Sequence, residues 1–160
     1  MQRRLLACIV GVLVLAALGY GAWYYVAERS AHVCHACLRP VHAHMKTIAV
    51  IDGKRANYCC PACAMSEHQQ SGKAVDIVEL TDYLDGKPLK PKDSFVVRNS
   101  DLNPCLDHQP AVGENSQPLQ AHFDRCAPSM LAFSDQQSAA AFAARHGGQV
   151  VPFADLAGNR

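Results

Sequence analysis

Five cysteines lie close together in the sequence, in two C-x2-C pairs with one extra thiol. Cys34 and Cys37 form the first pair, Cys60 and Cys63 form the second, and 22 residues separate Cys37 from Cys60. Two such pairs at this distance can converge on one ion, because each pair presents two thiolates on a tight turn. The spacing therefore predicts a metal site built from these four cysteines, with Cys59 as a fifth thiol beside it.

Histidines close to the cysteines extend this set of soft ligands. His42 and His44 alternate with Ala43, so they share one face if the chain is extended there, and Met45 follows directly. Thiolate, imidazole and thioether together favour a soft ion, and the surplus beyond the four ligands of a closed zinc site favours Cu(I). Zinc, held in a structural zinc-binding module, is the alternative. The candidate metal ligands are Cys34, Cys37, Cys59, Cys60, Cys63, His42 and His44.

Two other uses of the same cysteines remain open. In an oxidising compartment they could form structural disulfides, although the adjacent Cys59 and Cys60 make no obvious disulfide pattern. Cys60-Pro61-Ala62-Cys63 also has the spacing of a thioredoxin-type active site, whose first thiolate is activated at a helix start. The expected order of elements differs from a thioredoxin core, so we expect a binding protein rather than an enzyme.

A second pair of cysteines stands apart in the C-terminal half. Cys105 and Cys126 enclose 20 residues, and His108 and His122 lie inside that interval. We expect a disulfide that closes this loop and contributes about 3 kcal/mol, with a second metal site as the alternative. The cysteine count is odd, seven after the apolar N-terminal segment, so at least one thiol is unpaired or binds something.

The N-terminal segment has the composition of a membrane span. Residues 5–26 carry no charge, follow Arg3 and Arg4, and end in a cluster of aromatic residues. About 20 apolar residues cross a bilayer as a helix, and basic residues stay on the cytoplasmic side. We expect a single-pass anchor in the inner (cytoplasmic) membrane, with residues 28–160 on the periplasmic side. The alternative is a cleaved signal peptide.

Overall composition limits the remaining classes of function. The chain has 160 residues, a net charge of +1, 49% hydrophobic residues and 18% charged residues. The near-zero charge argues against a nucleic-acid partner, which normally requires a basic field. No Asp/Glu pair suited to acid–base catalysis and no glycine-rich phosphate loop is evident. The expected partners are a metal ion, the membrane and a client metalloenzyme.

The elements that must position the cysteines can be read from the turn signals. Two strands, at 45–52 and 54–58, are joined by an Asp-Gly hairpin turn. A helix begins at Cys60-Pro61, with proline in its first turn, and stops at Gly72. A strand at 75–80 follows. The first half thus reads β-β-α-β.

The second half repeats this order. Its expected elements are strands at 95–98, 130–133 and 149–153 and a helix at 135–146. Ser134 with Gln137 resembles a capping box for that helix, and residues 77–83 align with residues 150–156. The predicted fold class is α+β, two small β-β-α-β units after a transmembrane helix. The expected domains are residues 1–27 as anchor, 28–90 as the Cys-rich metal-binding unit and 91–160 as the second unit, which contains a long loop at 101–120.

The sequence resembles the NosL family of nitrous-oxide reductase accessory proteins. The resemblance rests on the early C-x2-C, on the hairpin that leads into a helix at 48–63, and on the tail. The tail combines Leu-Ala-Phe-Ser at 131–134 with a helix, His-Gly-Gly and a strand at 140–150. The resemblance implies two β-β-α-β domains, export from the cytoplasm and delivery of copper to a reductase.

Three features depart from the family pattern. Family members often have a Cys-Gly-Met run where this chain has Cys37-Leu38-Arg39. They are commonly lipoproteins, whereas no cysteine directly follows the apolar run here. The additional Cys59-Cys60-x2-Cys63 cluster instead resembles the Cys-rich hairpin and helix of zinc-binding and heavy-metal-sensing modules. The resemblance therefore implies the fold more than it implies the metal ligands.

Overall fold

The structure is a computed structural model that describes residues 2–106 and 124–157. By its internal contacts the chain separates into a helical segment, Met1–His32, and a compact unit, Val33–Arg160. The predicted domain boundary near residue 90 lies inside the compact unit and stays a prediction. The predicted loop at 101–120 falls mostly outside the described residues, as do His108 and His122.

The N-terminal segment is one helix, α1 (Gln2–Ala31). Its stretch Ile9–Glu28 is long and apolar enough to cross a membrane, with a mean hydropathy of 1.8. The described apolar side chains along it are exposed, among them Leu15 and Trp23. Helix α1 continues to Ala31, and the Nε2 of His32 lies 3.2 Å from the Oε1 of Glu28, one turn earlier.

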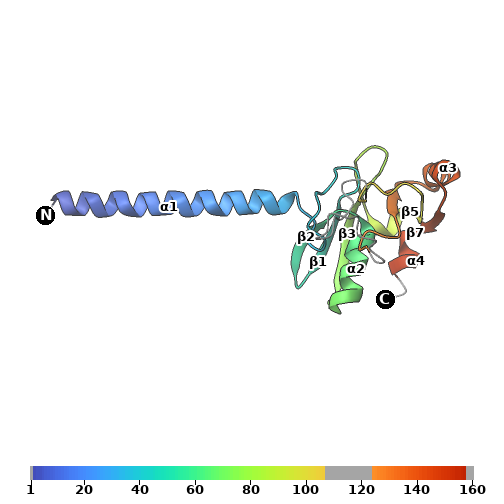
Figure 1. Ribbon diagram of the computed structural model, residues 1–160, viewed down its shortest axis with the longest axis horizontal. Coiled ribbons are helices and arrows are strands. Elements are labelled where there is room, and N and C mark those ends of the chain that lie inside the picture. The colour runs from blue at the N-terminus through green and yellow to red at the C-terminus, as the bar shows by residue number, and fades with distance from the viewer. Residues whose placement is uncertain (1, 107–123, 158–160) are drawn as a thin grey trace, which may run out of the picture. The chain divides into compact units, whose positions relative to one another are not determined.

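The first half of the compact unit is an antiparallel sheet with a helix beside it (Figure 1). Its elements are β1 (Thr47–Ile51), β2 (Lys54–Tyr58), α2 (Pro61–Ser71), β3 (Val75–Thr81) and β4 (Pro88–Leu89). The sheet order is β2-β1-β3-β4. Asp52 and Gly53 both have positive φ, 50° and 74°, as a tight hairpin requires. Gly72 ends α2 in the left-handed conformation, as predicted.

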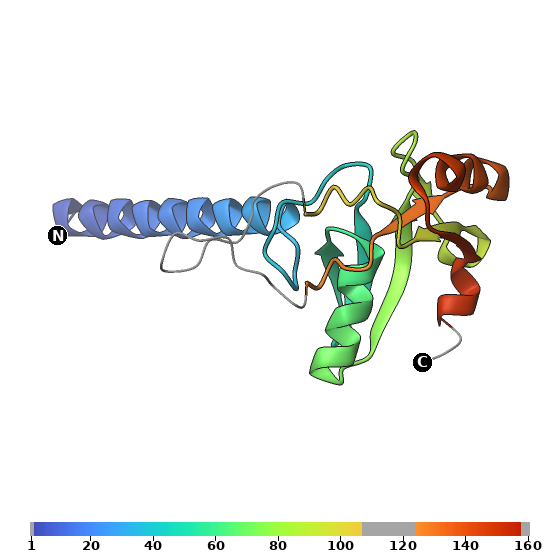
Figure 2. The same ribbon diagram turned by 45° about the vertical axis from the view of Figure 1, so that its right-hand side comes forward.

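The second half repeats the arrangement with a smaller sheet. Its elements are the 3-10 turn η1 (Pro91–Asp93), β5 (Phe95–Arg98), β6 (Met130–Phe133), α3 (Gln136–His146), β7 (Gln149–Pro152) and α4 (Phe153–Ala157). The sheet order is β6-β5-β7, all antiparallel. Figure 2 shows α2 beside the first sheet and α3 beside the second. The predicted α+β class with two β-β-α-β units is confirmed.

The cap of α3 differs from the expected one. Asp135, not Ser134, is the N-cap, and its Oδ1 accepts a hydrogen bond from the Ser138 backbone N–H at 2.8 Å. The Ser134 N–H is already used, because it donates to Oδ2 of Asp82 at 2.8 Å. A carboxylate placed one residue later satisfies the free N–H groups of the first helical turn equally well.

The two halves are joined by polar and aromatic contacts around the end of β3. The Tyr83 N–H donates to the carbonyl oxygen of Ala132 in β6 at 2.8 Å. The ring of Tyr83 meets Phe133 and Phe142 edge-on, with centroids 6.1 and 5.5 Å apart. The buried carboxylate of Asp82 accepts hydrogen bonds from both halves. These contacts fix the position of β5 and β6, which carry the segments that contain the two later cysteines.

Candidate metal centre

A tight turn presents the first two cysteines. The Cys34 N–H donates to the carbonyl oxygen of Arg39 at 2.9 Å, and the Leu38 N–H donates back to the carbonyl oxygen of Cys34 at 3.0 Å. Leu38 closes the turn with a positive φ of 60°. The His35 N–H bonds to β2, so the turn is tied to the hairpin that precedes the other thiols. Cys34 and Cys37 are thereby presented from one short loop.

The junction between β2 and α2 supplies three more thiols. Cys60 is the N-cap of α2, with an extended backbone, and Cys63 lies in the first turn of the helix. The Cys60 side chain makes no capping hydrogen bond. Cys59, the last residue before the cap, is completely buried, as is Cys63. The predicted helix start therefore places these sulfurs next to the Cys34–Cys37 turn.

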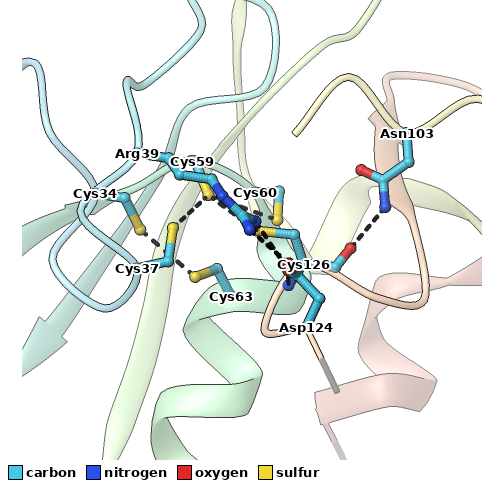
Figure 3. A network of polar contacts seen from close by, with 9 residues as sticks. All are labelled: Cys34, Cys37, Arg39, Cys59, Cys60, Cys63, Asn103, Asp124 and Cys126. Carbon is cyan, nitrogen blue, oxygen red and sulfur yellow. Dashed lines mark hydrogen bonds and ion pairs between the residues drawn. The ribbon is translucent and has the colours of Figure 1, made fainter. Parts of the chain in front are cut away.

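Four of the thiols form a compact group that we call tetrad 1: Cys34, Cys37, Cys59 and Cys63. Their sulfur atoms all lie within 4.8 Å of one another. The Sγ atoms of Cys34 and Cys63 are 3.5 Å apart, as are those of Cys37 and Cys59 (Figure 3). A tetrahedron with metal–sulfur bonds of about 2.3 Å has edges of about 3.8 Å, so this spacing fits a metal-thiolate site.

A second group, tetrad 2, consists of Cys59, Cys60, Cys105 and Cys126. Its sulfur atoms also lie within 4.8 Å of one another, and all four residues are buried. The Sγ of Cys59 is 3.4 Å from that of Cys126 and 3.9 Å from that of Cys60. Cys59 belongs to both groups, so the seven cysteines of residues 33–126 form one continuous cluster.

The disulfide expected between Cys105 and Cys126 is not formed. Both are free cysteines, as are the other five of the cluster. Sulfurs joined in a disulfide lie about 2.05 Å apart, whereas the shortest sulfur contact described here, Cys59 to Cys126, is 3.4 Å. The sulfurs of Cys105 and Cys126 instead lie with those of Cys59 and Cys60, in the first half of the compact unit.

Hydrogen bonds between the sulfurs distribute the charge unevenly. Donation from Cys37 lowers the pKa of Cys34, and donation from Cys105 lowers the pKa of Cys126. The pKa of Cys59 is raised, mainly because its S–H donates to Cys105. Each tetrad therefore contains one thiol that ionises readily, Cys34 in the first and Cys126 in the second. A cation can attach there first and displace protons from the remaining thiols.

Arg39 places a positive charge beside tetrad 2. One guanidinium nitrogen donates to Asp124 Oδ1 at 2.8 Å and to the Cys126 sulfur at 3.3 Å. The hydrogen bond to Asp124 raises the pKa of Arg39 further above its usual value, so the group stays charged. Asn103 holds the same segment through the carbonyl oxygen of Cys126 at 2.9 Å. The sequence pattern offered no signal for Arg39, because its partners lie 85 and 87 residues away.

The remaining candidates are placed differently from the sequence expectation. The spacing grouped Cys60 with Cys34, Cys37 and Cys63, but the structure puts Cys59 in that position and turns Cys60 toward Cys105 and Cys126. Among the described residues, neither tetrad includes a histidine. His44 is exposed, and its Nδ1 lies 3.0 Å from the carbonyl oxygen of Tyr83. The role of His42 and His44 as exchange ligands stays a prediction.

Comparison with known proteins identifies the architecture. No protein-family model matches the chain, and no curated protein matches it. Among solved structures, the crystal structure of the copper chaperone NosL from Shewanella denitrificans aligns with a TM-score of 0.50. The fold is NosL-like. The alignment covers 78% of this chain and 88% of NosL at 16% sequence identity, so it establishes the fold. It confirms, at the level of the fold, the resemblance inferred from the sequence.

Proposed function

We propose that this protein is a membrane-anchored, extracytoplasmic accessory protein that carries Cu(I) to a client metalloenzyme. Tetrad 1 is the proposed cargo site, and its four converging thiols are the observation that carries the proposal. Thiolate sulfur is a soft ligand that suits Cu(I) and zinc alike. The NosL-like fold supports copper as the cargo, because the protein solved with that fold is a copper chaperone.

Burial within tetrad 1 suits a site that must release its ion. Three of its thiols are completely buried, but Cys37 is only partly buried. An incoming ligand of the client can therefore displace Cys37 first, while the other three sulfurs still hold the ion. His42 and His44 follow the same loop and are the proposed intermediate ligands in that exchange. Transfer through shared coordination avoids release of Cu(I) into water.

The proposed location rests on α1. Its apolar stretch is 20 residues long, which matches the ~30 Å core of a bilayer at 1.5 Å per residue. Arg3 and Arg4 precede this stretch and favour a cytoplasmic N-terminus. The compact unit would then face the periplasm, where the client metalloenzyme is expected.

Two alternative functions, a structural zinc module and a thiol–disulfide oxidoreductase, differ in how far the structure supports them. A structural zinc module is favoured by the composition of tetrad 1, which matches closed zinc sites built from four cysteine ligands. A thiol–disulfide oxidoreductase would use Cys60 and Cys63, but their sulfurs belong to different tetrads. The pKa of each of these two thiols is raised, mainly through hydrogen bonds to Cys105 for Cys60 and to Cys126 for Cys63. A redox nucleophile requires a lowered pKa.

Competition for Cu(I) tests the proposal. The reduced full-length protein in detergent is titrated against a chromophoric Cu(I) chelator, in parallel with Zn(II). We expect Cys34→Ser and Cys63→Ser each to weaken Cu(I) binding by about 100-fold or more, since each removes a direct ligand of a set in which even supporting contacts matter 10–100-fold. Cys8→Ser, outside both tetrads, is the matched control and should bind as the wild type does.

Two outcomes would contradict the copper-carrier proposal. One is failure of the wild-type protein to compete for Cu(I) while it retains zinc, which would favour the structural zinc module. The other is Cu(I) binding that is unaffected by Cys34→Ser and Cys63→Ser. Reduction of insulin disulfides by the metal-free protein would favour the oxidoreductase.

A further inference from the structure

Tetrad 2 contains three thiols that a single cargo site does not use. We propose that the cluster binds two soft metal ions, one in each tetrad, and that the Cys59 thiolate bridges them. The second ion is held by Cys59, Cys60, Cys105 and Cys126. This second site goes beyond the proposed carrier function, which requires only the ion in tetrad 1.

The position of Cys59 carries the bridging assignment. Its sulfur is 3.5 Å from Cys37 in tetrad 1 and 3.4 Å from Cys126 in tetrad 2. A thiolate sulfur has three lone pairs, so it can bind two ions at once. Two four-coordinate sites need eight ligand positions, and seven cysteines fill them when one is shared. The odd number of cysteines after the apolar segment has its explanation here.

The alternative for tetrad 2 is a group of neutral thiols that act as small buried hydrophobes. That alternative explains burial but not the convergence of four sulfur atoms within 4.8 Å. If the thiols are neutral, the charged guanidinium of Arg39 donates to a neutral Cys126 thiol, whose sulfur lies 3.3 Å away. A charged donor gains most from an ionised acceptor. The arrangement is the one expected when Cys126 is a metal-bound thiolate.

The two ions would have different roles because their ligands come from different parts of the fold. Tetrad 1 uses the Cys34–Cys37 loop and the β2–α2 junction, all in the first half of the compact unit. Tetrad 2 joins that junction to Cys105, which follows β5, and to Cys126, which precedes β6. The ion in tetrad 2 therefore links the two halves. All four of its ligands are buried, so it is the less exchangeable ion.

Proton and charge balance are consistent with this assignment. Each of the seven cysteines releases its S–H proton to solvent when it binds metal, and the Cys59 thiolate then forms two metal–sulfur bonds. The seven thiolates leave a net charge of three negative units with two divalent ions, as in the cadmium-loaded protein, and of five negative units with two Cu(I) ions. The guanidinium of Arg39 lies at hydrogen-bond distance from the Cys126 sulfur and also forms an ion pair with Asp124. No electrons are transferred, so no oxidant or reductant is needed.

Cadmium-113 NMR tests the bridge directly, because Cd(II) is a soft ion that takes tetrahedral thiolate sites. The reduced full-length protein in detergent is loaded with ¹¹³Cd(II) to saturation. We expect two resonances in the shift region of sulfur-only ligation, each split by scalar coupling to the other cadmium through the Cys59 sulfur. Cys105→Ser should retain one unsplit resonance, and the control Cys8→Ser should retain both split ones.

The outcomes separate this proposal from the carrier function. A single resonance at saturation in the wild-type protein would overturn the second site and leave tetrad 1 as a cargo site. Two resonances without mutual coupling would overturn the Cys59 bridge. The wild-type spectrum alone decides both points, so the proposal remains testable if Cys105→Ser fails to fold.

Discussion

Cys59→Ser is expected to remove more bound metal than any other single cysteine substitution in the cluster. Cys59 is the only described residue that belongs to both tetrads, so its loss leaves three thiolates at each position. We expect the metal content of the full-length protein to fall from two ions to less than one after gel filtration. Elemental analysis of the purified, reduced protein measures this content against protein concentration.

Substitutions confined to one tetrad provide the controls for this result. Cys34→Ser affects tetrad 1 only and Cys105→Ser affects tetrad 2 only, so each should reduce the content by one ion. Cys8→Ser should leave it unchanged. If Cys59→Ser lost no more metal than Cys34→Ser or Cys105→Ser, the shared role of Cys59 would be wrong. Circular dichroism of each variant distinguishes lost ligands from lost folding.

Removal of metal is expected to destabilise the compact unit strongly. An ion that binds only the folded state stabilises it by about 4 kcal/mol when it is present at 1,000 times its dissociation constant. Tetrad 2 also lies between the two halves, so its ion contributes directly to their association. A strong chelator should therefore lower the free energy of unfolding of the wild-type protein by about 4 kcal/mol or more.

Urea unfolding of the full-length protein, followed by near-ultraviolet circular dichroism with and without chelator, measures this effect. The chelator should shift the midpoint of the wild-type protein and of Cys8→Ser equally. It should have little effect on Cys59→Ser, which has already lost most of its metal. Equal midpoints for the wild-type protein with and without chelator would show that the cluster does not stabilise the fold through bound ions.

Local signals were enough to predict most of the fold. Strands 54–58, 95–98 and 130–133 have the predicted bounds, because turn residues and β-forming side chains mark their ends. Helix α2 begins and ends as predicted, since proline and glycine act through the backbone of their own turn. The shift of the α3 cap from Ser134 to Asp135 reflects competition from Asp82, 52 residues away, which no local pattern contains.

The candidate site was predictable only in part. Sequence spacing identified the five cysteines from Cys34 to Cys63, because short loops keep neighbouring cysteines close. The spacing could not show that Cys59 rather than Cys60 joins Cys34. The side chains of adjacent residues point in different directions, and the spacing does not tell which of the two faces Cys34. For Cys105 and Cys126 the spacing favoured a disulfide, with a second metal site as the alternative. It could not show that both cysteines approach Cys59, since this depends on how the two sheets pack.

X-ray absorption at the copper edge tests the central claim most directly. The reduced full-length protein is loaded with Cu(I), and the scatterers around copper are identified from the extended fine structure. The account predicts a first shell of sulfur alone, with a second copper scatterer nearby once both tetrads are filled. Nitrogen scatterers with the outer-shell pattern of imidazole, or no second copper scatterer when two copper ions are bound, would contradict it.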